Sequence, residues 1–134
     1  MQLLVNIDVD DLDRATAFYT RCLGLSLGRR LGADIRELVG LAVPIYLIAK
    51  PAGSLPHAGA TAGRTYARHW TPVHLDVAVD DLDAAVARAL AAGAIQETPI
   101  AAEAWGSIAT LSDPFGNGFC LLQFTARGYD AITS

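Results

Sequence analysis

The sequence predicts an α+β fold of two tandem β-α-β-β-β modules that form a curved sheet around a cavity. The first observation is a repeat at an offset of seventy residues, in which Val9–Asp13 recurs as Val79–Asp83 and Ala15 recurs as Ala85. The second is that an alternating strand leads straight into an acidic helix start in both copies. The third is that strand patterns follow each helix. A repeat of this length makes half of the chain the unit of folding.

The composition limits the classes of function. With 134 residues, 52% hydrophobic and 18% charged, the chain can bury a sizeable core. A net charge of −4 without a basic run makes nucleic acid and anionic membranes poor partners. No apolar run is long enough to span a bilayer, and no basic leader precedes the first strand. Since Cys22 and Cys120 are far apart in sequence, we expect a reduced, cytoplasmic protein.

The chain divides into four segments by pattern. Residues 1–50 form the first module and residues 72–126 the second. Residues 51–71 between them begin with a run of Pro, Gly, Ser and Ala, a composition typical of linkers. Residues 127–134 form a C-terminal tail. We expect the two modules to share one structural domain.

In the first module, Asp10 or Asp11 is expected to cap a helix that ends at Gly24. The apolar stripe of this helix is Leu12, Ala15, Tyr19 and Leu23. The expected strands are residues 3–9, 25–31, 34–39 and 44–50.

In the second module, the helix covers residues 80–92 and ends at Gly93. Its apolar stripe is Leu82, Ala85, Val86, Ala89 and Leu90. Residues 113–118 form a turn rich in Pro, Gly and Asn. The expected strands are residues 72–79, 94–100, 106–111 and 119–124.

One helix can cover only one face of each sheet, so the other face is expected to line a cavity. Side chains alternate between the faces of a strand, and this alternation places Asn6, Asp8, His74 and Asp76 on the cavity side. Ligand pockets are mostly apolar with a few placed polar groups. We therefore expect a small-molecule site on this surface.

Local motifs add a family resemblance. They are Ala17-Phe18-Tyr19 near the end of the first helix, Leu23-Gly24-Leu25 after it, and the Asp-Pro-x-Gly-Asn turn at residues 113–117. With the paired modules, they resemble the vicinal oxygen chelate superfamily, which includes glyoxalase I, fosfomycin-resistance enzymes, extradiol dioxygenases and bleomycin-resistance binding proteins. The resemblance covers nearly the whole chain and implies the glyoxalase/bleomycin-resistance-like fold. It leaves the activity open, because one scaffold serves several chemistries.

The resemblance also implies four metal-ligand positions. The metal-dependent members place His or Glu on the first and last strands of each module. The corresponding positions here are Leu4, Tyr46, His74 and Cys120. A divalent ion needs three or more suitable donors, and Leu4 offers none. We therefore expect a degenerate site with no cofactor; any bound divalent metal would use His74, Cys120 and Tyr46.

The leading functional hypothesis is metal-independent binding of a small organic, aromatic molecule by a homodimer, as the resemblance to bleomycin-resistance proteins implies. One alternative is a metal-dependent lyase or dioxygenase of the glyoxalase type with an atypical ligand set. Another is a metal-free enzyme with His74 and Asp76 as catalytic candidates. Purely structural roles stay open too: Cys120 as a small buried hydrophobe, Asp76 as a solvated strand residue and the aromatic residues as core. The candidate ligand-binding residues are His74, Asp76, Asn6, Tyr46, Cys120, Trp70 and Trp105.

Overall fold

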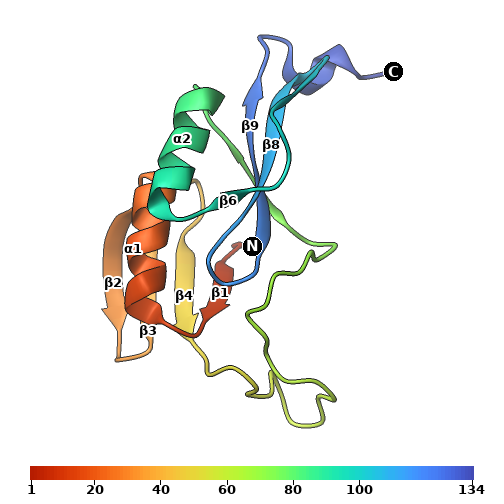
Figure 1. Ribbon diagram of the computed structural model, residues 1–134. Coiled ribbons are helices and arrows are strands. Elements are labelled where there is room, and N and C mark those ends of the chain that lie inside the picture. Colours follow the sequence, from red (N-terminus) through yellow and green to blue (C-terminus); the bar gives the residue numbers. More distant parts are fainter. The chain divides into compact units, whose positions relative to one another are not determined.

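The computed structural model describes residues 1–134, which divide into two compact units, Met1–Ala67 and Arg68–Ser134. Both units follow the expected order of strand, helix and strands (Figure 1). The first unit contains β1 (Val5–Val9), α1 (Leu12–Leu23), β2 (Ser26–Leu31), β3 (Ile35–Val39) and β4 (Ile45–Ala49). The second contains β5 (Leu75–Ala78), α2 (Leu82–Ala92), β6 (Ile95–Gln96), β7 (Ala101–Glu103), β8 (Gly106–Ser112), β9 (Gly118–Phe124) and the 3-10 helix η1 (Gly128–Ala131). The predicted α+β class and repeated module are confirmed.

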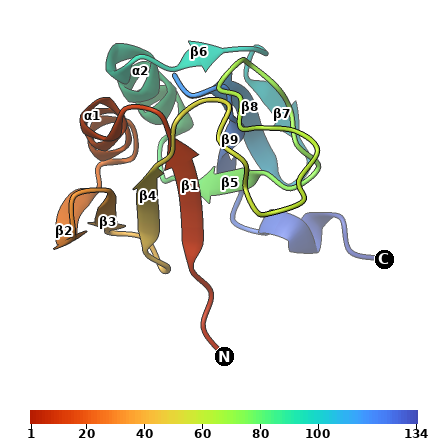
Figure 2. The same ribbon diagram turned by 90° about the horizontal axis from the view of Figure 1, so that it is seen from below.

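The first unit forms a four-stranded sheet in the order β1-β4-β3-β2. β1 runs parallel to β4, whereas the other neighbours are antiparallel. α1 lies across one face of this sheet (Figure 2). The buried side chains of the unit are Val9, Ala15, Phe18, Tyr19, Cys22, Leu25, Glu37, Leu38, Ile45 and Leu47. Apart from Glu37, they form an apolar core, and the hydrophobic effect is its main source of stability.

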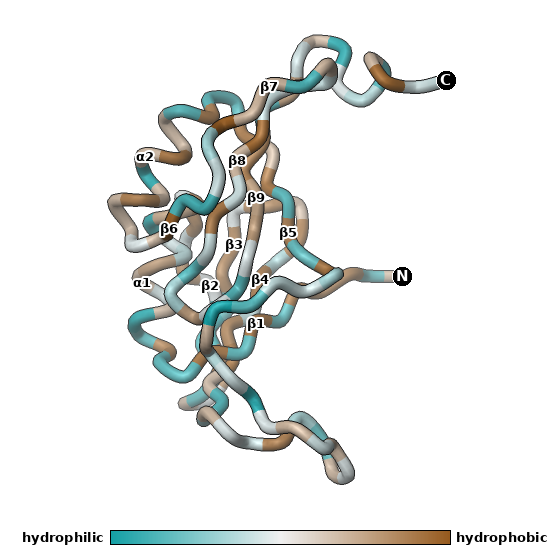
Figure 3. Tube along the Cα trace, turned by 45° about the vertical axis from the view of Figure 1, so that its right-hand side comes forward, coloured by the Kyte–Doolittle hydropathy of each residue, from teal (hydrophilic) through white to brown (hydrophobic).

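The second unit repeats this topology in the order β5-β9-β8-β6, with β7 also paired to β8. β5 is parallel to β9, as β1 is to β4. α2 contacts β6, β8 and β9. Hydrophobic residues run along β8 and β9 (Figure 3). Neither helix is long and apolar enough to cross a membrane.

The two helices begin and end in the same way. The Asp11 carboxylate accepts a hydrogen bond from the Arg14 backbone N–H at 2.9 Å, and Asp81 accepts one from Ala84 at 3.0 Å. Each aspartate thus satisfies a backbone donor that has no partner within the helix. The C-terminal ends use Gly24 and Gly93 with φ of 67° and 111°, a region that favours glycine. Of the two aspartates considered for the first cap, the structure selects Asp11.

Several predicted helix positions were wrong. Phe18 and Cys22 are buried on α1, whereas Leu12 and Leu23 are only half-buried. On α2, Leu90 is 43% exposed. The α1 stripe is therefore shifted toward Phe18 and Cys22, because packing against the twisted sheet selects the face. On α2 the other four predicted residues are buried as expected.

The strand limits also differ from those predicted. β1 and β5 begin at Val5 and Leu75, so Leu4 and His74 precede the strands on which they were expected. The strand expected at 94–100 is only the short β6, and β7 was not predicted. The reason is local: the backbone N–H groups of Glu97 and Thr98 both donate to the Thr110 carbonyl, which interrupts regular pairing.

We predict that Asp11→Ala and Asp81→Ala each lower the free energy of unfolding by about 1 kcal/mol, because each removes a helix cap. Urea unfolding monitored by circular dichroism measures this loss. Asp10→Ala and Asp80→Ala are the matched controls, since these neighbours do not cap, and their effects should stay below about 0.5 kcal/mol. Equal losses in the caps and the controls would contradict the assignment.

Candidate functional site

On each sheet, the face away from the helix carries a row of three paired residues. In β4, Ile45 and Leu47 are buried, and Tyr46 between them points to the other face. In β9, Cys120 has the same relation to Phe119 and Leu121. Pairing across the strands gives Asn6–Tyr46–Glu37 in the first unit and Asp76–Cys120–Thr110 in the second. The two rows occupy equivalent places in the two modules.

In the second unit, the structure brings three candidate residues together. Ligand atoms of His74, Asp76 and Cys120 all lie within 4.8 Å of one another. His74 Nε2 lies 3.3 Å from Asp76 Oδ1, and both side chains are about one-third exposed, at 33% and 39%. Although His74 precedes β5, its side chain contacts Asp76, which is the β5 member of the row. The cluster offers hydrogen-bonding groups at a partly solvated surface.

Trp70 forms an aromatic wall beside this cluster. Its ring centroid lies 4.7 Å from that of His74, and Trp70 as a residue is 46% exposed. The Arg68 guanidinium lies 5.7 Å from the indole centroid and is itself held by Glu97. At Gly118 a side chain would collide with the indole, so the missing Cβ makes room for Trp70. The supporting roles of Arg68 and Glu97 were not predicted.

The surroundings of Cys120 disfavour it as a nucleophile and as a metal ligand. The side chain is buried, and burial raises the pKa of its thiol. The nearby Asp76 charge raises this pKa further, whereas the contact with Thr110 Oγ1, 3.7 Å from Sγ, acts in the opposite direction. The reactive form of cysteine is the thiolate, which this environment disfavours.

In the first unit, the row contains a polar network that sequence reasoning missed. The Glu37 side chain is only 9% exposed, and its carboxylate accepts hydrogen bonds from Arg29 Nε at 2.8 Å and Nη2 at 2.6 Å. Tyr46 donates to Glu37 Oε1 at 2.9 Å and accepts from Arg29 Nη2 at 3.0 Å. Tyr46 is therefore engaged in this network, which disfavours it as a metal ligand. The available signal was a glutamate in the middle of a predicted strand, since a buried carboxylate needs partners.

The negative charge of Asp8 in β1 is neutralised by Arg64, in the segment that follows β4. Asp8 Oδ2 accepts a hydrogen bond from Arg64 Nε at 2.6 Å. The same guanidinium donates to the carbonyl of Leu55 at 2.8 Å, and Gly53 donates from its backbone to Arg64. Asp8 is thus part of a structural ion pair. Asn6, in contrast, has an exposed side chain.

Two predicted residues lie away from these clusters. Trp105 packs with Phe124 and Tyr129, with ring centroids 6.0 Å and 5.5 Å away. This aromatic cluster lies where Gly106 pairs with Phe124, at the opposite end of the β8–β9 pair from Gly118 and Trp70. Leu4 lies outside β1, is 47% exposed and has no donor atom.

We predict that Glu37 makes stability depend on acid pH. Hydrogen bonds from the Arg29 side chain, then from its backbone N–H, lower the pKa of Glu37 from 4.5 to about 2, against the opposing effect of burial. A lowered pKa stabilises the folded state fully above pH 4.5, and this stabilisation is lost as pH falls towards 2. The free energy of unfolding, measured with urea across this pH range, should therefore decrease more steeply for the wild type than for Glu37→Gln as the pH falls. The exposed Glu103→Gln is the control, and parallel curves for the wild type and Glu37→Gln would contradict the prediction.

The comparisons with known proteins agree with this fold. A glyoxalase/bleomycin resistance/dioxygenase family enzyme from Burkholderia phytofirmans superposes with a TM-score of 0.73 at 24% identity, covering 91% of this chain and 97% of that one. A glyoxalase/bleomycin resistance protein from Albidiferax ferrireducens gives 0.65 at 25% identity, with coverage of 91% and 97%. The fosfomycin resistance protein FosX from Listeria monocytogenes gives 0.70 at 18% identity, with 95% of each chain covered.

No curated protein matches the chain. The glyoxalase-like domain profile matches residues 4–122, which includes both helices and every strand except the last two residues of β9. The match spans the same paired modules whose motifs resemble the vicinal oxygen chelate superfamily. The protein therefore belongs to the glyoxalase-like domain family of that superfamily.

Proposed function

We propose that the protein binds a small organic molecule without a metal, at the surface formed by Trp70, His74 and Asp76. The observation that carries this proposal is the exposed indole, 4.7 Å from the His74 ring, beside the His74–Asp76 pair. An aromatic ligand can stack on the indole while the imidazole and carboxylate fix its polar groups. The groups are partly exposed, so a ligand can reach them.

The donor set supports the choice of a metal-free site. Of the four positions that the resemblance implies, Leu4 has no donor and Tyr46 is hydrogen-bonded to Glu37 and Arg29. Cys120 has a raised thiol pKa, whereas a metal binds the thiolate. Of the four positions, only His74 carries a residue type that the metal-dependent members use. One imidazole makes a weak metal site.

The relatives leave both binding and catalysis open. Solved structures similar to this chain include a fosfomycin resistance protein and a lactoylglutathione lyase from Agrobacterium tumefaciens. Likeness at 18% and 19% identity concerns the fold, and function depends on the site. The homodimer and the cytoplasmic location stay predictions.

One observation favours a second candidate, a metal-dependent glyoxalase-type lyase or dioxygenase. Asp76 adds a carboxylate to His74 and Cys120, and these three side chains supply N, O and S donors within 4.8 Å of one another. Zinc accepts this mixture of ligands, and catalytic zinc sites have three protein ligands with one open position. A metal held there would act as a Lewis acid toward a bound oxygen.

We predict that an aromatic-rich compound screen by thermal shift gives ligands that raise the melting temperature, because a ligand of the folded state stabilises it by mass action. For such a ligand, calorimetry should give roughly tenfold weaker binding with His74→Ala or Asp76→Asn, since each removes a hydrogen-bonding group. His57→Ala, in an exposed segment of the first unit, should leave affinity unchanged. Chemical turnover of the ligand would instead support the metal-free enzyme.

We predict that the purified protein, after dialysis against zinc, retains far less than one zinc per chain by elemental analysis. The reason is the protonated, buried thiol and the short list of donors. The matched variants are His74→Ala and Cys120→Ser, with Cys22→Ala as a cysteine control in the first unit. Stoichiometric zinc that is lost in the first two variants and kept in the third would contradict the metal-free proposal and favour the second candidate.

A further inference from the structure

Residues 68–70 form a short segment that is attached to the second sheet before β5 begins. The backbone N–H of His69 donates to the Gly116 carbonyl at 3.0 Å, and His69 forms an isolated parallel bridge with Asn117. These contacts hold the backbone next to Trp70. They do not hold the indole itself, because a side chain on a fixed backbone still has several rotamers.

The indole of Trp70 is not held by burial in the core, since the residue is 46% exposed. It lies over Gly118, where a Cβ would collide with the indole and would lie 2.9 Å from Nη2 of Arg68. The indole and the Arg68 guanidinium therefore share the space that the missing side chain leaves. Any movement of the guanidinium changes the surroundings of the indole.

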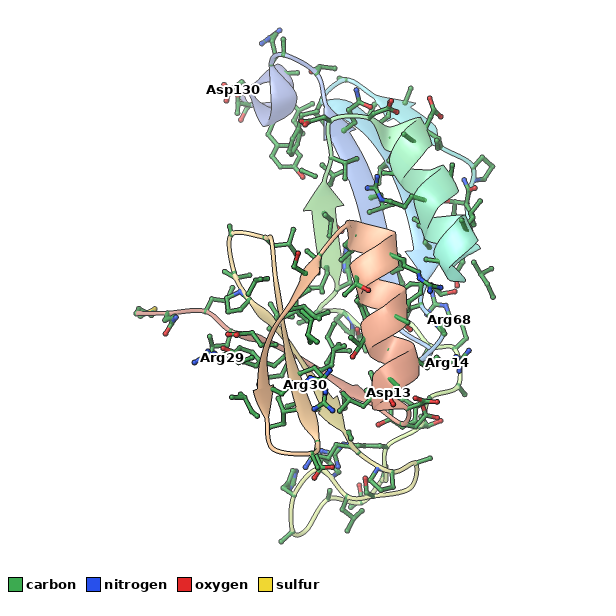
Figure 4. All side chains as sticks on the ribbon, turned by 90° about the vertical axis from the view of Figure 1, so that its left-hand side faces the viewer. Asp13, Arg14, Arg29, Arg30, Arg68 and Asp130 are labelled. Carbon is green, nitrogen blue, oxygen red and sulfur yellow. The ribbon has the colours of Figure 1, made fainter.

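Glu97 holds the guanidinium of Arg68 at two points. Arg68 Nε donates to Glu97 Oε1, and Nη2 donates to Oε2 at 2.5 Å. The third nitrogen, Nη1, donates to the Gly116 carbonyl at 3.4 Å. A two-point pair fixes the plane of the guanidinium as well as its position. Figure 4 shows Arg68 at the end of the second unit away from Asp130 and the tail.

The second sheet in turn orients Glu97. Its backbone N–H donates to the Thr110 carbonyl at 2.9 Å, where regular pairing after β6 is interrupted. The hydrogen bond from Arg68 lowers the pKa of Glu97 most, and a hydrogen bond from the buried Ser112 side chain lowers it further, against the opposing effect of burial. The carboxylate is therefore ionised at neutral pH and accepts both hydrogen bonds.

This geometry makes Arg68 a support for the indole rather than a ligand contact. Each nitrogen of its guanidinium already has an acceptor in the protein, and Glu97 balances its charge. Its Cζ lies 5.7 Å from the indole centroid, within the range of a cation–π interaction. An indole that is ordered before a ligand arrives saves the entropy cost of ordering it, which is worth roughly two- to tenfold in affinity.

We propose that Arg68 and Glu97 are positioning residues: their ion pair holds the Trp70 indole as a fixed wall of the site, and neither residue contacts the ligand. The expected effect on ligand binding rests on the proposed function. The expected effect on the indole does not, because its order can be measured without a ligand.

The first measurement follows Trp70 alone. The chain has two tryptophans, so Trp105→Phe leaves Trp70 as the only one. In this parent, Arg68→Gln and Glu97→Gln should each weaken the near-UV circular dichroism of the indole and raise its acrylamide quenching constant by about twofold, because a freed indole samples more rotamers. The far-UV spectrum should not change. Glu103→Gln, on an exposed glutamate of β7, is the control and should leave both signals as in the parent.

A double variant separates positioning by the pair from two independent effects. If Arg68 and Glu97 act as one unit, the variant with both changes loses no more of the Trp70 signal than either single variant does. If each residue acts by itself, the two losses add.

The second measurement uses benzimidazole, a planar aromatic molecule with one N–H donor and one nitrogen acceptor. It is titrated into the full chain, and the ring signals of His74 are followed by NMR. Arg68→Gln and Glu97→Gln should each weaken binding by roughly two- to tenfold. If benzimidazole leaves the His74 signals of the wild type unchanged, the proposed function fails for this probe, and the Trp70 spectra still decide the positioning role.

Three results would overturn the proposal. They are Trp70 spectra that stay as in the parent in both single variants, additive losses in the double variant, and weaker benzimidazole binding without a change in the Trp70 spectra. The third result would mean that the pair contacts the ligand directly. If one single variant does not fold, the other variant and Arg68→Lys, which loses the two-point pair, provide the same test.

Discussion

Each unit depends on one parallel strand pair that joins its first strand to its last. β1 pairs with β4 from Val5↔Ile45 to Val9↔Ala49, and β5 pairs with β9 in the same sense. A parallel pair needs a long connection, and here that connection contains the helix and the remaining strands. The single helix covers one face. The side chains on the other face do not pack against the helix, so the helix-facing core does not determine which residues occur there.

Glu37 is the clearest residue of this kind. Placing a carboxylate in the middle of a sheet is costly unless its oxygen atoms are fully paired. Glu37 meets that requirement with four hydrogen bonds, from the backbone and side chain of Arg29 and from Tyr46. A bulge in β2 and Gly28 together give the carboxylate the room and the backbone N–H that it needs.

The repeat made the fold predictable, because helix caps and strand alternation follow local rules. Gly24 and Gly93 end their helices as expected, and Asp11 is one of the two aspartates expected to begin the first. The second helix begins at Leu82, whereas the prediction started it at residue 80. The buried face of each helix was harder to predict from the sequence, because it depends on how the helix is oriented on its sheet. Leu90, which is exposed, and Cys22, which is buried, illustrate this.

The site was predictable only in part. Alternation and the resemblance together nominated His74, Asp76 and Cys120, and the structure brings them together. Arg29 could not be nominated by alternation, because the bulge shifts the parity of β2 and a bulge depends on the partner strand. Trp105 was assigned to the pocket by residue type alone, and its packing on Phe124 and Tyr129 depends on the tail.

The equivalent rows show how one repeat can acquire two chemistries. The repeat is preserved where backbone structure requires it, at the caps and in the strand pairing. It differs in the row on the free face, where Tyr46 corresponds to Cys120 and Glu37 to Thr110. The first row fixes an arginine with a carboxylate; the second leaves a histidine and a carboxylate partly exposed beside an indole. The two modules therefore share a backbone plan and differ in the side chains of the row on the free face.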